Sequence, residues 1–132
     1  MPERPLVAIV DDDESYRRAT QSLLRAAGFS TAVFADAESF LKSAIRASAA
    51  CLVADMRMPG MSGLELYQAL VASGDRIPAI LITAYADDDT RLRARNAGIA
   101  CFLGKPFAAD DLLECINEAL AQPRPGRTIP RS

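Results

Sequence analysis

The sequence predicts a doubly wound α/β fold, in which a parallel sheet carries helices on both faces. Two observations predict it. Short apolar, β-prone runs recur five times along the 132 residues, and segments with helical periodicity lie between them. Connections of this length favour parallel strands joined by right-handed crossovers. The five expected strands are Leu6–Val10, Ser30–Phe34, Cys51–Ala54, Ala79–Ile82 and Ala100–Leu103.

The first two connecting segments have the periodicity of amphipathic helices. Between the first and second strands, the expected apolar face comprises Tyr16, Ala19, Leu23 and Ala27. In the next segment, the i, i+3, i+4, i+7, i+8 pattern is complete in Ala37, Phe40, Leu41, Ala44 and Ile45. Each helix is therefore expected to pack one face against the sheet.

The third helix has a sequence signal for its start. Ser62 is followed three residues later by Glu65, which is the spacing of a capping box. The expected apolar face of this helix comprises Leu64, Tyr67, Leu70 and Val71. Left-handed helix ends are expected at three glycines, Gly28, Gly74 and Gly98.

The fourth helical segment, residues 87–97, has few apolar residues. Leu92 is its only large one, and Arg91, Arg93 and Arg95 occupy the same turns. A helix with few buried contacts is weakly anchored and is a candidate for a movable part, although a merely exposed helix fits the pattern equally well.

A fifth helix is expected to end near Ala121, because three prolines within residues 122–132 prevent its continuation. We therefore expect one domain, residues 1–121, and a tail or linker, residues 122–132. The arginines of this tail could contact phosphate, but its composition favours a solvated connector. For the strand order we adopt 2-1-3-4-5, by analogy with flavodoxin-like folds.

Composition excludes several function classes. Lys and Arg number 15 against 17 Asp and Glu, so the chain has no overall basic field for direct nucleic-acid binding. Histidine is absent, which removes Ser-His-Asp and Cys-His nucleophile systems and most transition-metal sites. No apolar run approaches the ~20 residues of a membrane span, and no signal peptide is evident. The expected location is cytoplasmic, without membrane association.

The three cysteines, Cys51, Cys101 and Cys115, are odd in number and widely spaced. This pattern argues against both a disulfide framework and a zinc site. We expect them to be reduced, small core residues.

Chemistry-bearing residues follow the expected strands. Because ligands bind outside the carboxyl ends of parallel strands, these residues should gather at one edge. They are Asp11 and Asp12, Asp55, Thr83, and Lys105 with Pro106. Carboxylates held together repel, by roughly 4 kcal/mol per pair at ~4 Å and an effective dielectric near ~20, so a cation must sit among them. Oxygen ligands without histidine suit Mg²⁺. Carboxylates, a metal, a lysine and a hydroxyl together indicate phosphoryl transfer onto an aspartate.

At these residues the sequence resembles the receiver domains of two-component response regulators. The resemblance covers about residues 6–121 and is strongest in residues 7–14, 52–63, 82–84 and 102–107. The phrase Asp-Met-Arg-Met-Pro-Gly-Met-Ser-Gly, residues 55–63, looks most like the branch of nitrogen-fixation regulators, whose output domain is a DNA-binding helix-turn-helix. The present sequence does not extend to such a domain.

The resemblance implies a role for each matching residue. Asp55 would be the phosphoacceptor, and Asp11, Asp12 and Asp55 would hold Mg²⁺ together with the backbone carbonyl of Arg57. Thr83 and Lys105 would bind the phosphoryl oxygens. The resemblance also implies a switch pair, Thr83 and Phe102, lifetime-tuning side chains at Arg57 and Tyr85, and a cis peptide bond between Lys105 and Pro106.

The implied function is a phosphorylation-activated switch. A partner histidine kinase or histidine phosphotransfer protein would supply the phosphoryl group, so the chain would be a signalling protein that catalyses its own phosphorylation and dephosphorylation. The added charge would reshape the surface of the fourth helix, fifth strand and fifth helix to control an output such as transcription. By the same resemblance, two receivers would pair through this surface as a homodimer.

Two alternatives stay open from the residues alone. Asp11-x-Asp13-x-Ser15 resembles the first motif of haloacid-dehalogenase phosphatases, with Asp11 as nucleophile, although the chain is short for that family. The second alternative is a receiver-like interaction module that never carries phosphate. Singly, each residue also has an ordinary reading as a helix cap, a turn residue or a surface charge.

Overall fold

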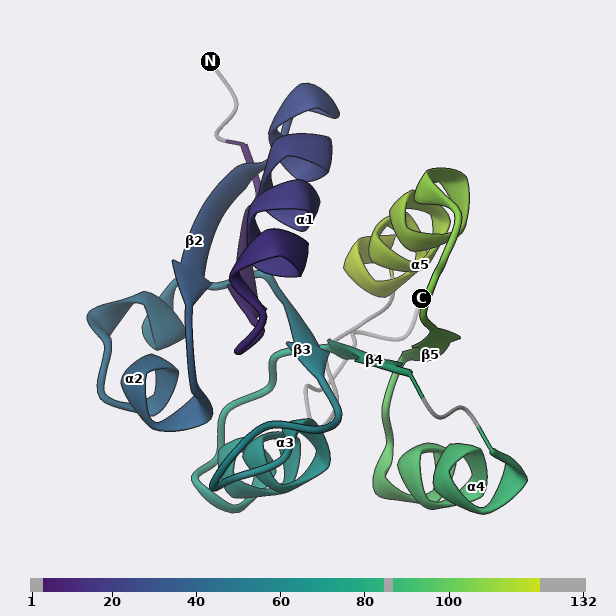
Figure 1. Ribbon diagram of the computed structural model, residues 1–132. Coiled ribbons are helices and arrows are strands. Elements are labelled where there is room, and N and C mark those ends of the chain that lie inside the picture. Colours follow the sequence, from purple (N-terminus) through teal and green to yellow (C-terminus); the bar gives the residue numbers. More distant parts are fainter. Residues whose placement is uncertain (1–3, 85–86, 122–132) are drawn as a thin grey trace, which may run out of the picture.

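The computed structural model describes residues 4–84 and 87–121. Tyr85 and the expected tail, residues 122–132, lie outside the described residues. Five parallel strands form one sheet in the order β2-β1-β3-β4-β5. Helices α1 and α5 cover one face, and α2, α3 and α4 cover the other (Figure 1). This is the doubly wound, flavodoxin-like arrangement that the sequence predicts.

The strands begin and end close to the expected residues. They are β1 (Leu6–Val10), β2 (Ser30–Phe34), β3 (Cys51–Asp55), β4 (Ala79–Thr83) and β5 (Cys101–Gly104). The last three end one residue later than predicted, because main-chain pairing continues to Asp55, Thr83 and Gly104. Asp55 and Thr83 are therefore held by the sheet itself rather than by a loop.

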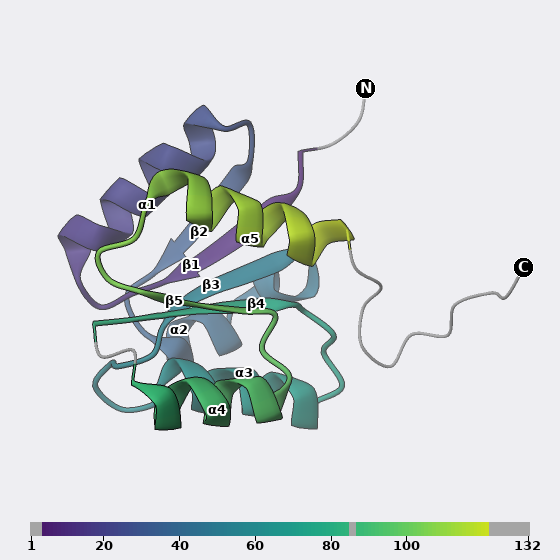
Figure 2. The same ribbon diagram turned by 90° about the vertical axis from the view of Figure 1, so that its right-hand side faces the viewer.

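The helices are α1 (Glu14–Ala26), α2 (Ala37–Leu41), α3 (Gly63–Ala72), α4 (Asp88–Ala97) and α5 (Ala109–Ala121), with a short 3₁₀ helix, η1 (Ala44–Ala47). Figure 2 shows the layers edge-on, with α1 and α5 on one side of the sheet and α3 and α4 on the other. Among the described residues, no helix combines the length and the apolar character needed to cross a bilayer.

The sheet divides the hydrophobic core in two. Side chains alternate along each strand, so Ala8 and Val10 face the α2–α3–α4 layer while Val7 and Ile9 face the α1–α5 layer. The central strands β3 and β4 are buried along their whole length. Burial on both faces is the reason these strands read as continuous apolar runs.

The predicted buried face of α1 is partly wrong: Leu23 packs against the core as expected, but the face is turned by one position. Thr20 and Leu24 are buried, whereas Ala19 and Ala27 are exposed. Alanine contributes little apolar area, so the larger Leu24 decides which way the helix turns.

The predicted second helix is broken in two. The helix α2 ends at Leu41, and η1 begins after Ser43, whose hydroxyl accepts a hydrogen bond from the Ile45 N–H. Ser43 thus caps a new turn with extended backbone, because its side chain competes with the helical hydrogen bonds. Phe40 is nevertheless fully buried, and Leu41 and Ile45 pack against the same core.

The helix α3 has the capping box that the sequence predicts, with Ser62 and Glu65 bonding reciprocally. Its buried face includes Leu64, Tyr67 and Leu70 as expected, but also Leu66 in place of Val71. The face is therefore rotated toward Leu66, which is fully buried.

The helix α4 is as weakly anchored as its sequence indicates. Leu92 is 54% exposed, and Ala94 is the only buried residue among the helix's described positions. The helix ends at Gly98 with a φ of 98°, the left-handed geometry expected there and also found at Gly28 and Gly74.

The expectation that all three cysteines are reduced is wrong for two of them. Cys101 on β5 and Cys115 on α5 form a disulfide, with their Cα atoms 6.0 Å apart. Only Cys51 is a free, buried thiol. A separation of 14 residues concealed the pair, because only the packing of α5 on β5 brings the two side chains together.

Candidate functional site

The expected site residues converge at one edge of the sheet, at the carboxyl ends of four strands. The strands β1 and β3 are neighbours in the sheet, although β2 lies between them in the sequence. Asp11 and Asp12 follow β1, Asp55 ends β3, Thr83 ends β4, and Lys105 follows β5. This is the topological switch point at the carboxyl ends of the strands, where ligands bind in open α/β sheets.

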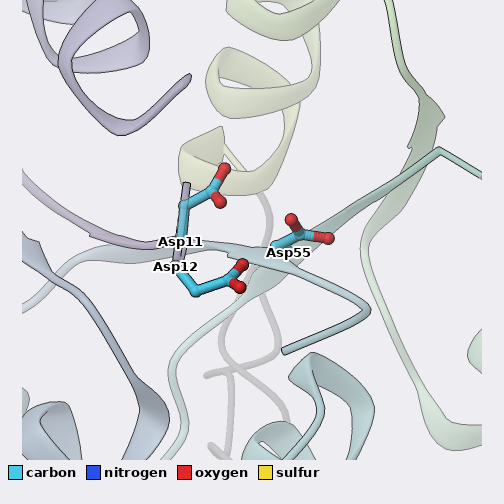
Figure 3. A group of neighbouring side chains, drawn as sticks. All are labelled: Asp11, Asp12 and Asp55. Atoms are coloured by element: carbon cyan, nitrogen blue, oxygen red, sulfur yellow. The ribbon is translucent and has the colours of Figure 1, made fainter. Parts of the chain in front are cut away.

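The three aspartates form a compact acidic cluster. One carboxylate oxygen of each lies within 4.8 Å of the others, and Figure 3 shows the side chains gathered at the ends of β1 and β3. Asp11 and Asp55 are buried, whereas Asp12 is exposed. The cluster is therefore partly buried and is accessible to solvent at Asp12.

Lys105 bridges two of these carboxylates. Its Nζ lies 2.9 Å from Oδ2 of Asp55 and 3.4 Å from Oδ2 of Asp11. The same ammonium lies 4.0 Å from the ring centroid of Tyr16, a cation–π contact from α1. The Lys105–Pro106 peptide bond is cis. Lys105, which follows β5, thus brings a positive charge to Asp55 and Asp11, although β5 is separated from β3 by β4 in the sheet.

The charges of the cluster shift one another's protonation. Burial raises the pKa of the Asp11 carboxyl, and the negative charge of Asp55 acts in the same direction, against the opposing Asp13 N–H and Lys105. Burial is also the strongest single influence on Lys105 and acts to lower its pKa. The hydrogen bonds and charges of Asp55 and Asp11 together outweigh burial and raise the pKa of Lys105. Lys105 is therefore a permanent cation at neutral pH.

The backbone around Asp11 is fixed by local hydrogen bonds. The Asp13 N–H donates to Oδ1 of Asp11 at 2.9 Å, and Asp13 itself caps α1 by accepting from the Tyr16 N–H. Arg17 Nη1 donates to the backbone carbonyl of Asp11 at 2.8 Å. Asp13 is thus a helix cap, whereas the neighbouring Asp11 lies in the acidic cluster.

Asp55 is held by the turn that follows it. The Arg57 N–H donates to Oδ1 of Asp55 at 3.1 Å, so this loop approaches the carboxylate with its backbone. At Gly63, a Cβ atom would lie 2.5 Å from the backbone carbonyl oxygen of Asp55 and 3.0 Å from Leu81 Cδ2. Only glycine allows α3 to begin this close to the end of β3.

Thr83 and Phe102 occupy the β4–β5 side of the site. Thr83 is fully buried and pairs with Gly104 in the register of β4 and β5. Phe102 is partly buried against the α2–α3–α4 core, and the guanidinium of Arg91 lies 5.2 Å from its ring centroid. A cation–π contact therefore joins the weakly anchored α4 to Phe102 on β5.

Sequence reasoning missed four contributors to this geometry: Tyr16, Arg17, Gly63 and Arg91. Gly63 carries a usable signal, because glycine directly after a helix cap is otherwise unfavourable in the first turn. The contacts of the other three depend on how α1 and α4 pack, and their positions in the sequence give no signal for them.

Comparison with known proteins assigns the class. Residues 7–117 match the family model of the response regulator receiver domain. The chain belongs to this family, so it is the receiver domain of a response regulator, the switching component of two-component signal transduction. The phosphatase alternative is not favoured by this match.

Individual relatives agree with the class. The response regulator protein TodT of Pseudomonas putida is 38% identical over 115 residues, which are 87% of this chain and 51% of TodT. The transcriptional regulatory protein FixJ of Bradyrhizobium diazoefficiens is 35% identical over 119 residues, 90% of this chain and 58% of FixJ. The crystal structure of FixJ-N superposes with a TM-score of 0.81 at 36% identity, covering 90% of this chain and 95% of that one. The chain thus spans about half the length of these curated relatives.

Proposed function

We propose that Asp55 is the phosphoacceptor of this receiver and takes its phosphoryl group from a phosphohistidine on a sensor histidine kinase or a histidine phosphotransfer protein. The observation that carries this proposal is the pairing of Asp55 with Lys105 at 2.9 Å inside the acidic cluster. Of the two carboxylates that Lys105 contacts, the one nearer its ammonium, at 2.9 Å rather than 3.4 Å, is where the negative charge of a phosphoryl group is best compensated. Asp55 is that carboxylate.

In the proposed reaction, a carboxylate oxygen of Asp55 forms a bond to phosphorus while the phosphorus–nitrogen bond of the donor histidine breaks. The electron pair of that bond stays on the imidazole, which takes a proton, and the product is an acyl phosphate. Lys105 would move from neutralising a carboxylate to binding a phosphoryl oxygen, and the Thr83 hydroxyl would donate a hydrogen bond to another. In dephosphorylation a water oxygen bonds to the same phosphorus while its bond to the Asp55 oxygen breaks, so the carboxylate is restored and inorganic phosphate carries away the oxygen of the water.

The donor set fits Mg²⁺. Three carboxylates within 4.8 Å supply hard oxygen ligands, and the backbone carbonyl of Arg57, two residues beyond Asp55, is proposed as a further one. When bound, the ion supplies positive charge that offsets the carboxylates and the incoming phosphoryl oxygens. The exposed Asp12 leaves the cluster accessible to solvent on the side from which an ion or a partner would approach.

The proposed response to phosphorylation begins at two residues of β4 and β5. Thr83 and Phe102 would shift when Asp55 is phosphorylated, and the surface of α4, β5 and α5 would change with them. We propose that this surface binds a partner or a second receiver, and that the domain comprises residues 1–121 with residues 122–132 as a connector. The proposed setting is the cytoplasm, with transcription as the output, by analogy with the transcriptional regulatory protein FixJ. Arg57 and Tyr85 are proposed to tune the lifetime of the phosphate.

The test is phosphorylation by a small donor. The chain incubated with Mg²⁺ and acetyl phosphate should gain the mass of one phosphoryl group, and chelation of Mg²⁺ should abolish the gain. Asp55→Asn should not gain mass, whereas Asp110→Asn, which changes an exposed carboxylate on α5, should behave as wild type. Phosphorylation of Asp11 would instead support the phosphatase alternative. No gain in the wild type under any condition would support an interaction module without phosphate.

A further inference from the structure

The disulfide between Cys101 and Cys115 lies outside the acidic site and has no part in the proposed phosphorylation. Side chains alternate along β5, so Cys101 and Leu103 pack toward α5 while Phe102 between them packs toward α4. The helix α5 runs along the sheet on the side opposite α4 (Figure 2). The disulfide therefore joins α5 to β5 on the opposite face of the strand from Phe102.

We propose that Cys101 and Cys115 are a reversible redox couple that ties α5 to β5 when a small disulfide oxidant such as glutathione disulfide oxidises it. Their Cα separation of 6.0 Å lies within the range that natural disulfides span, so the backbone already presents both thiols to one another. In a protein proposed to work in the cytoplasm, where thiols are kept reduced, such a pair is expected to open and close rather than stay closed.

The exchange takes place in two balanced steps. The thiolate of Cys101 attacks one sulfur of glutathione disulfide, forming a mixed disulfide and releasing one glutathione. The Cys115 thiol then loses its proton and attacks the Cys101 sulfur, which expels the second glutathione and leaves the internal disulfide. Two protein thiols are oxidised, and one glutathione disulfide is reduced to two glutathione thiols.

The burial of the three cysteines supports this order. Cys101 is partly exposed on the edge strand β5, so an oxidant can reach it, whereas Cys115 is buried at 8% exposure and is placed to resolve the mixed disulfide. Cys51 is fully buried, and burial raises the pKa of its thiol to about 12. Cys51 is therefore an unreactive thiol with which the reactivity of Cys101 can be compared in the same chain.

The position of the couple links it to the site. The loop that the disulfide closes runs from residue 101 to residue 115 and contains both Phe102 and Lys105. Lys105 reaches Asp55 and Asp11 from within this loop, at 2.9 Å and 3.4 Å. Closing the disulfide would restrict the segment that carries the proposed switch aromatic and the phosphate-binding lysine. This coupling to phosphorylation rests on the proposed function, whereas the redox couple itself takes from it only the proposed cytoplasmic setting.

The first test is chemical. The reduced chain treated with glutathione disulfide should lose the mass of two hydrogen atoms, and peptide mapping without reductant should link Cys101 to Cys115 while Cys51 is alkylated only after unfolding. Cys115→Ser should stop at a glutathione adduct on Cys101. The proposal is overturned if the wild type keeps separate thiols, stops at glutathione adducts, or forms its disulfide with Cys51 or with a second chain.

The second test measures the constraint. The oxidised chain should melt roughly 5–10 °C above the reduced chain, since a closed loop of this size restricts the unfolded chain. The doubly substituted Cys101→Ser, Cys115→Ser chain should melt at one temperature under both conditions. An unchanged melting temperature in oxidised wild type would contradict a constraint on β5 and α5.

The third test separates this proposal from the proposed function. Acetyl phosphate should label Asp55 more slowly in the oxidised wild type than in the reduced wild type, and at equal rates in the double cysteine variant. Equal rates in the wild type despite a formed disulfide would overturn the coupling alone. Absence of labelling in the reduced wild type and in the double variant would overturn the proposed function, whatever the redox result.

Discussion

The helices α3 and α4 cover the same face of the sheet (Figure 1), and they are held in different ways. The helix α3 buries five residues, begins with a reciprocal capping box and approaches β3 at Gly63 more closely than any side chain would permit. The helix α4 buries Ala94 and leaves Leu92 exposed. The difference indicates that the half holding Asp55 is fixed by packing, whereas the half adjoining Phe102 can shift with a small loss of buried area.

The largest expected effect comes from truncating a buried leucine on α3, compared with an exposed leucine on α4. Leu66→Ala on α3 should lower the free energy of unfolding by about 2–5 kcal/mol, because the side chain is fully buried and leaves a cavity. Leu92→Ala on α4 should change it by less than about 0.5 kcal/mol, because that side chain is 54% exposed. Urea unfolding of the two variants measures both values. Equal losses would contradict the difference in anchoring.

A smaller effect is expected from filling the close approach at the start of α3. Gly63→Ala should cost about 1–3 kcal/mol and slow acetyl phosphate labelling, because the new methyl group displaces the backbone of Asp55. Gly74→Ala is the matched control: its φ of 87° makes alanine strained there, but no atom lies within 4 Å of the added carbon. Gly74→Ala should therefore lower stability without slowing labelling. If both variants are labelled equally slowly, α3 does not position Asp55 through this contact.

The smallest effect concerns the start of α4. Hydrogen bonds from the backbone and side chain of Thr90 lower the pKa of the Asp87 carboxyl that caps this helix. Because this pKa is depressed in the folded state, the contribution of the cap is present above the ordinary value of 3.8 and is lost as pH falls through the lower folded value. The Thr90 amide resonance should follow this titration by NMR. Asp87→Ser keeps a capping oxygen that does not titrate, and its Thr90 resonance should lose the transition. Persistence of the transition in Asp87→Ser would assign it to another group.

Much of the site follows from the strand ends. Asp11, Asp55, Thr83 and Lys105 each stand where an apolar run stops, and parallel strands bring such residues to one edge whatever their loops do. Predictions failed where apolar residues were small or where local polar bonds competed. Ala19 and Ala27 count as apolar but bury too little area to orient α1, and the Ser43 cap interrupts a helical pattern that is otherwise complete.

Alternating strand and helix patterns determined the fold class from the sequence alone, because side-chain periodicity is a local property. The carboxylates, hydroxyl and lysine at the strand ends, together with the absence of histidine, indicated the kind of chemistry proposed, because donor type is local as well. Only the tertiary structure decided that Lys105 bonds Asp55 rather than solvent, that Arg91 lies over Phe102, and that Cys101 meets Cys115. Each of these contacts joins residues of two different segments, so its distance depends on how those segments pack together, which the periodicity of the sequence does not report.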